Sequence, residues 1–160
     1  MSNENVQWIN ERFRSNLTEG DLSSVSDFLL FWSLFEKIAC NRQANIGSLF
    51  EFAQNNEHRF NRELVNDTMT YFKDRYFENG TVTERFQYLR IQRQELSDFV
   101  VNTFQNETPL FLDILKTCLI IVYRFRNNLF HGEKNILKIN TQDDNFKNSN
   151  NFLKHLLECQ

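Results

Sequence analysis

The chain has 160 residues, with one Pro, four Gly and 17 Phe. So few turn-forming residues argue against a β-sandwich or barrel, which needs a turn about every 8–12 residues. The 18 basic and 21 acidic residues leave a net charge of −3. This excludes a broadly basic surface for nucleic acid, although a small, focused positive site remains compatible with it. The composition predicts a single domain of long helices around a Phe-rich core.

Residues 1–10 contain neither the basic start nor the apolar stretch of a signal peptide. The longest apolar runs, at residues 28–32 and 118–123, are too short to span a bilayer. The three Cys form neither a CxxC pair nor a Cys/His cluster with zinc spacing, so we expect free thiols. The sequence therefore predicts a soluble, cytoplasmic protein that has no metal, no cofactor and no membrane contact.

Apolar residues at helical spacing predict helices along most of the chain. The expected helices cover residues 5–17, 22–41, 47–56, 59–78, 82–92 and 94–105. Asn79-Gly80 is a typical turn pair, and Pro109 suits the start of a longer helix over residues 109–131. Gly132 directly follows that helix, as expected of a residue that ends one.

The last part of the chain has a different composition. Residues 136–139 could be extended, and residues 141–151 are rich in Asn, Asp and Lys, which is typical of a loop. We expect an all-α antiparallel helical bundle with a core at about 5–133, a loop at about 134–145 and a docking helix at about 146–158.

Two predicted helices each carry one charge on an otherwise apolar face, Arg126 in 109–131 and Glu36 in 22–41. Because a charge is costly to remove from water without a partner, one interpretation is an Arg126–Glu36 ion pair between packed helices. The other is that Arg126 faces a cleft and binds an anion there. Both hold if Glu36 orients Arg126 and leaves some of its donors free. The predicted helix over residues 109–131 is also apolar on its other sides, which predicts a central position or a face toward a second subunit.

Residues 123–134 read Tyr-Arg-Phe-Arg-Asn-Asn-Leu-Phe-His-Gly-Glu-Lys. Four residues separate Arg126 from His131, and the polar Asn127 directly follows the Arg. This segment resembles the R-x4-6-H signature of the HEPN superfamily, all-α domains of which many are RNases. The upstream run from Phe28 to Glu36 is also similar to HEPN domains. The order of the helices resembles that of the superfamily over roughly residues 20–158, whereas the resemblance in motif covers only about a dozen residues.

The residue types suit RNA cleavage by attack of the 2′-OH on phosphorus. His131 titrates near neutral pH and can move a proton. The fork of donors on Arg126 matches phosphoryl oxygens. A helix C-terminus favours a protonated imidazole, so His131 is expected to donate a proton to the 5′-oxygen leaving group. Asn127 orients one of these two groups or contacts the phosphate.

Residues five apart on a helix point about 140° apart, so one helix presents Arg126 and His131 poorly to a single phosphate. Two helices related by a two-fold axis could bring both motifs to one cleft, and the resemblance implies a site at such a homodimer interface. Arg124 and Lys134 flank the motif and either guide the RNA backbone or form a solvated pair. Glu36 is expected at most to orient Arg126, without contact to the RNA.

The resemblance thus implies a homodimeric, metal-independent endoribonuclease of the toxin–antitoxin or phage-defence type, with RNA as its partner. The alternative is a catalytically inactive HEPN-like module that binds RNA or another protein. Some HEPN toxins carry a Tyr two residues after the His, which a partner antitoxin modifies, and Glu133 occupies that position here. A protein antitoxin that binds the cleft, or no antitoxin at all, therefore remains open.

Overall fold

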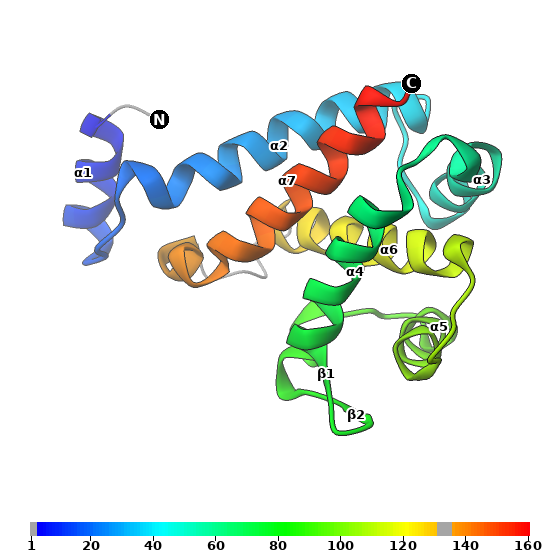
Figure 1. Cartoon of the computed structure of the whole chain (residues 1–160). Coiled ribbons are helices and arrows are strands. Elements are labelled where there is room, and N and C mark those ends of the chain that lie inside the picture. Colours follow the sequence, from blue (N-terminus) through cyan, green and yellow to red (C-terminus); the bar gives the residue numbers. More distant parts are fainter. Residues whose placement is uncertain (1–2, 131–135) are drawn as a thin grey trace.

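The computed structural model describes residues 3–130 and 136–160. In these residues the fold is helical except for one short hairpin, which confirms the all-α prediction (Figure 1). The α-helices are α1 (Asn3–Phe13), α2 (Glu19–Ala39), α3 (Ile46–Asn56), α4 (Arg62–Tyr76), α5 (Gln94–Gln105), α6 (Phe111–Phe130) and α7 (Asp143–Glu158). Short 3-10 helices are η1 (Glu57–Arg59), η2 (Glu84–Leu89) and η3 (Ile136–Gln142).

Helices α2 and α3 both begin with side chains that satisfy the free N–H groups of the first turn. At α2, Thr18 Oγ1 accepts from the Asp21 N–H at 3.2 Å, and Asp21 Oδ2 accepts from the Thr18 N–H at 2.8 Å. At α3, Asn45 and Ser48 form the same reciprocal pair. Such capping boxes fix where a helix starts, so α2 begins three residues before the expected position.

Helix α6 lies at the centre of the core. Leu115 and all residues from Thr117 to Val122 are fully buried, with α3, α4 and α5 packed around them. Near its C-terminal end, the Phe125 ring lies 5.8 Å from the Phe72 ring of α4 and 6.3 Å from the Phe146 ring of α7. The single chain therefore accounts for the all-round apolarity of α6, and this feature by itself requires no second subunit.

Helix α7 packs along α2 and closes the bundle, as expected of a docking helix. The Phe28 and Phe146 rings lie 5.2 Å apart, and Ser24 Oγ donates to Asp143 Oδ1 at 2.7 Å. Both helices run from left to right in Figure 1, so this pair packs in parallel and departs from the expected antiparallel arrangement.

The expected loop over residues 141–151 is wrong, because α7 already begins at Asp143. The short polar residues that suggested a loop are buried in the helix and form hydrogen bonds there. Ser149 Oγ donates to the Asn145 carbonyl at 2.7 Å, and Asn150 Nδ2 donates to the Ser24 carbonyl at 2.8 Å. The preceding residues of η3 form a 3-10 helix and are not extended.

The expected helix over 82–92 is also absent, since an antiparallel hairpin and η2 occupy this region. Strands β1 (Phe77–Glu78) and β2 (Thr81–Val82) flank Asn79 and Gly80, which have φ angles of 51° and 80°. Positive φ at both loop positions is the geometry of a tight hairpin turn, which confirms the Asn-Gly prediction. The apolar Phe86 and Leu89 are three residues apart, the period of a 3-10 helix.

His155 has a structural role in the docking of α7. Its Nε2 accepts a hydrogen bond from the Asn61 N–H at 2.9 Å, at the start of α4. Burial lowers the pKa of His155, which keeps the ring neutral and able to accept this bond.

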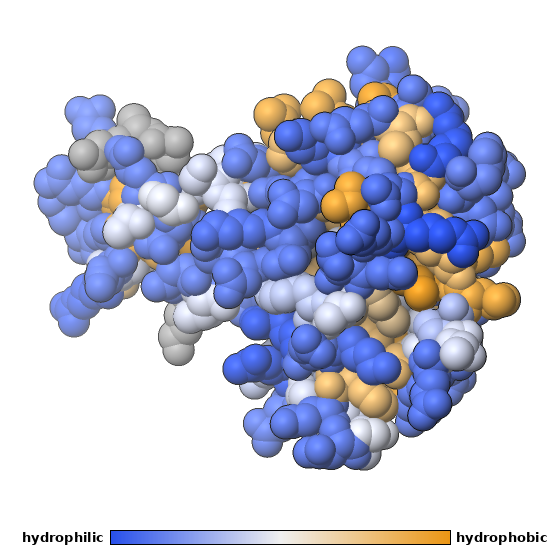
Figure 2. Space-filling view, in the orientation of Figure 1, coloured by the Kyte–Doolittle hydropathy of each residue, from blue (hydrophilic) through white to orange (hydrophobic). Residues whose placement is uncertain are grey.

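Within residues 3–130 and 136–160, no helix is long and apolar enough to cross a membrane. The face in Figure 2 is mostly hydrophilic, and its hydrophobic side chains gather in the right-hand half, where α3, α4 and α5 lie in Figure 1.

Candidate functional site

Arg126 projects from α6 near its C-terminal end and is half-buried. One of its terminal nitrogens donates to Asn127 Oδ1 at 3.1 Å, and its guanidinium carbon lies 4.7 Å from the centre of the Phe130 ring. Its Nε is buried without a hydrogen-bond partner. In the described part of the chain, no carboxylate pairs with Arg126. The side chain therefore holds a positive charge that the described residues do not neutralise.

The expected Arg126–Glu36 ion pair is not formed, because the Glu36 carboxylate has another partner. Glu36 Oε1 accepts from the Ala44 N–H at 3.0 Å, and the Glu36 carbonyl accepts from the N–H groups of Cys40 and Arg42. Glu36 thus holds the loop between α2 and α3. It acts on the start of α3, and it does not orient the guanidinium of Arg126.

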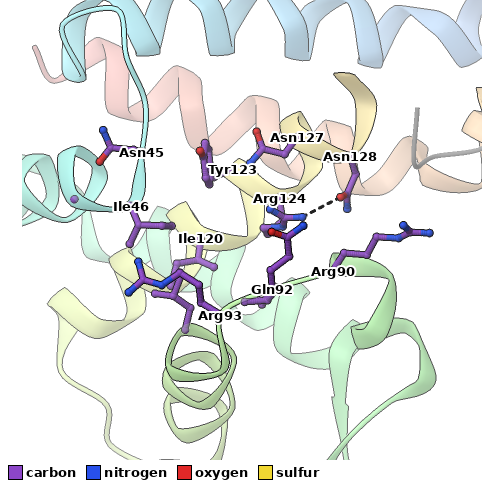
Figure 3. A pocket seen from close by; sticks show the side chains of 13 residues that line it. Asn45, Ile46, Arg90, Gln92, Arg93, Ile120, Tyr123, Arg124, Asn127 and Asn128 are labelled. Carbon is purple, nitrogen blue, oxygen red and sulfur yellow. Dashed lines mark hydrogen bonds between the residues drawn. The ribbon is translucent and has the colours of Figure 1, made fainter. Parts of the chain in front are cut away.

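Arg124 and Asn128 hold the end of η2 against α6. Arg124 Nε donates to the Leu89 carbonyl at 2.9 Å and a second Arg124 nitrogen donates to Asn128 Oδ1 at 3.3 Å (Figure 3). Asn128 Nδ2 donates to the carbonyls of Tyr88 and Leu89 at 3.1 and 3.3 Å. These carbonyls lie at the end of a 3-10 helix, where backbone acceptors lack partners within the helix.

We call Arg124 and Asn128, with their hydrogen bonds to the end of η2, the clamp. It was not predicted from the sequence. Asn128 is only 2% exposed. The one clue in the sequence was the spacing of Arg124 and Asn128, which are four residues apart and therefore lie on the same face of an apolar helix. Burial lowers the pKa of Arg124, yet an arginine remains protonated in proteins. Two of the Arg124 nitrogens are already bound, so the structure holds this side chain in place and does not leave it fully solvated.

A pocket of about 480 Å³ opens between α6, the start of α3 and residues 90–96. Figure 3 shows α6 crossing it, with the start of α3 on one side and the segment that leads into α5 below. Three arginines line it, Arg90, Arg93 and Arg124, together with the amide side chains of Asn45, Gln92, Asn127 and Asn128. Among the described residues, no Asp or Glu belongs to the lining of this pocket, so these residues concentrate positive charge in an acidic chain.

Asn127 links the pocket to Arg126. It is 8% exposed, lines the pocket, and its Oδ1 accepts from Arg126. Arg126 itself is not part of the pocket lining, as expected for adjacent residues that point about 100° apart on a helix.

The structure therefore groups Arg124, Asn127 and the neighbouring Arg126 at one end of α6, whereas the Glu36 carboxylate binds the Ala44 N–H and not these residues. His131 and Lys134 lie outside the described residues, as do Gly132 and Glu133. His131 directly follows Phe130, the last residue of α6. In the described part of the chain, no three His, Cys, Asp or Glu side chains gather as a metal site requires.

Comparison of the chain with models of protein families, with curated proteins and with solved structures found no match.

Proposed function

We propose that this protein is a metal-independent endoribonuclease of the HEPN type, which acts in a toxin–antitoxin or phage-defence system. The observation that carries the proposal is the state of Arg126. Its half-buried guanidinium has no carboxylate partner among the described residues, and its Nε forms no hydrogen bond. A cation in this state is suited to bind an oxyanion such as a phosphate.

The contacts around Arg126 support a positioned guanidinium. Asn127 Oδ1 binds one terminal nitrogen, and the Phe130 ring lies against the guanidinium plane. These two contacts limit the rotation of the side chain, so less entropy is lost when a phosphate binds. Asn127 is thus proposed as the residue that positions Arg126.

In the proposed reaction, the 2′-oxygen forms a bond to phosphorus and the bond from phosphorus to the 5′-oxygen breaks. A base removes the proton of the 2′-OH, and protonated His131 donates a proton to the departing 5′-oxygen. Arg126 stabilises the negative charge that develops on the phosphoryl oxygens. The products are a 2′,3′-cyclic phosphate and a free 5′-OH. The role of His131 rests on its place in the sequence.

This mechanism predicts that the purified protein cleaves single-stranded RNA in the presence of excess EDTA. The products should carry 2′,3′-cyclic phosphate ends, which mass spectrometry of the fragments detects. His58→Ala serves as the control, because His58 is exposed on η1 and its loss should leave the rate unchanged. A folded protein that leaves a panel of RNAs uncut, or that cuts only with added metal, would contradict the proposal.

We also propose that the active form is a homodimer in which the two copies of the motif share one cleft. An exposed apolar ring lies beside the site in support of this arrangement, since Phe130 is 62% exposed while it contacts Arg126. We expect sedimentation velocity to show a dimer at the concentrations that cleave RNA, and Phe130→Ser to weaken it. A monomer throughout the active range rules the shared cleft out.

The alternative is a non-catalytic module that binds RNA or another protein. The bond between Arg126 and Asn127 favours it to some degree, because it shows that Arg126 already has a structural contact. The EDTA assay separates the two, since a module of this kind binds RNA without cutting it. A protein antitoxin that covers the cleft is the partner that the toxin proposal implies.

A further inference from the structure

The charge of the pocket differs from that of the chain. The chain has three more acidic than basic residues, whereas the lining that the described residues form contains Arg90, Arg93 and Arg124 and no acidic side chain. Arg93 pairs with Glu95 at 2.6 Å, but both side chains are well exposed. An exposed ion pair contributes little to stability, so Arg93 can exchange this partner for a bound anion.

Two helix N-termini meet at the pocket. The lining includes the first residues of α3 and Arg93, the residue before α5. Arg93 occupies the N-cap position of α5, and its side chain forms no capping hydrogen bond to this helix. The first N–H groups of a helix lack intrahelical partners and carry partial positive charge, which favours an anion beside them. The capping box of Asn45 and Ser48 already satisfies part of this need at α3, so the start of α5 is the more open of the two ends.

A buried amide gives a second, independent indication of a ligand. Asn127 is 8% exposed and lines the pocket, and only its Oδ1 has a partner, Arg126. The Nδ2 of Asn127 forms no hydrogen bond within the described residues. This nitrogen is not one of the fully buried atoms that lack a partner, so it is open to a ligand oxygen in the pocket.

The pocket also has an apolar wall, formed by Ile46, Ile91 and Leu96, and the Tyr123 side chain lies above it in Figure 3. Its volume of about 480 Å³ lies within the range typical of small-ligand sites. The lining thus combines arginine and amide side chains with apolar ones, a combination that suits a phosphate joined to a ribose and a base.

We propose that this pocket binds one nucleotide unit of an RNA strand, with its phosphate among Gln92, Arg93 and Asn127 and its base against the apolar wall. The inference rests on the proposed function, because it places the nucleotide next to the one that Arg126 contacts. Asn127 lies between the two positions and donates into the pocket while it holds Arg126.

The test is calorimetric titration of the full chain with a 2′-O-methyl oligonucleotide, which lacks the attacking 2′-OH and cannot be cleaved. Gln92→Glu, which adds a negative charge at the exposed rim with almost no change of shape, should weaken binding at least tenfold. Gln54→Glu is the matched control, because Gln54 is exposed on α3 and does not line the pocket. Arg93→Ala should weaken binding as well, while Arg12→Ala on α1 should not.

A nucleoside 5′-monophosphate and its unphosphorylated nucleoside form the other two arms. If the monophosphate displaces the oligonucleotide, the pocket takes a terminal phosphate. If it does not displace the oligonucleotide, the pocket takes an internal phosphodiester. Competition by the nucleoside that equals that of the monophosphate overturns the proposal. Equal affinities of the Gln92→Glu and Gln54→Glu proteins, or no binding of any probe to the wild type, overturn it too.

These outcomes are separate from those of the cleavage assay. Binding that depends on Gln92 in a protein that cuts no RNA supports the pocket and refutes the ribonuclease. Cleavage in EDTA by a protein whose RNA affinity is unchanged in Gln92→Glu supports the ribonuclease and refutes the pocket.

Discussion

Arg126→Ala is expected to lower kcat/KM for RNA cleavage by a factor of about 100 to 1000, the usual cost of removing one group that stabilises an oxyanion. The guanidinium binds charge that appears on the phosphoryl oxygens in the transition state, so the main loss should be in kcat. Arg126→Lys should recover only part of the rate, because an ammonium keeps the charge but lacks the planar fork of donors. Single-turnover cleavage of a labelled RNA measures both variants.

The control for this experiment is Arg12→Ala, which removes an exposed arginine from α1. His131→Ala is the companion variant, and its rate should fall by a similar factor and lose its dependence on pH near neutrality. An Arg126→Ala protein that stays folded and cleaves RNA within about threefold of the wild-type rate would remove Arg126 from the mechanism, since the expected loss is at least 100-fold.

Asn128→Ala is expected to lower the free energy of unfolding by about 2–3 kcal/mol. The amide joins α6 to the carbonyls of Tyr88 and Leu89 and accepts from Arg124. Because Asn128 is buried, its removal leaves these groups without partners in a place that water reaches poorly. Urea unfolding monitored by circular dichroism measures the loss.

Asn102→Ala is the control for Asn128, since Asn102 is an exposed residue of α5 and its loss should change stability by less than about 0.5 kcal/mol. The combined Arg124→Ala and Asn128→Ala protein should be less destabilised than the sum of the two single changes, because both remove the same clamp. Strict additivity, or a cost for Asn128→Ala no larger than that of the control, argues against the clamp.

The helices whose apolar residues repeat over several turns could be predicted from the sequence. The repeat in α6 predicted its length, and it predicted that the helix is covered on all sides, by its own chain or by a second subunit. The structure shows that its own chain covers it. The start of α7 was missed, since Asn145 and Ser149 are polar and were assigned to a loop. Both are buried, and their polar groups are satisfied because Asn145 accepts a hydrogen bond from Tyr71 and Ser149 donates one to the helix backbone.

Part of the candidate site was also visible in the sequence. Arg126 was recognised because a charge is unusual on an apolar helix face, and Asn127 because it is the polar residue that directly follows the Arg in the motif segment. The structure joins the two by a hydrogen bond. The pocket was not recognised. Its residues come from three separate segments, two of which contain no motif, and they face a common space only after α3 and α5 have packed on α6.

The sequence by itself was sufficient to assign the helical class, the longest apolar helix and the unusual position of the Arg126 charge on it, because each depends on local spacing along one element. The partners of the charged groups were decided by the tertiary structure alone. Glu36 binds the Ala44 N–H and Arg124 binds the Leu89 carbonyl, 35 residues away in the chain. Such pairings depend on the angles and distances at which helices pack, and the periodicity of a single helix carries no information about these quantities.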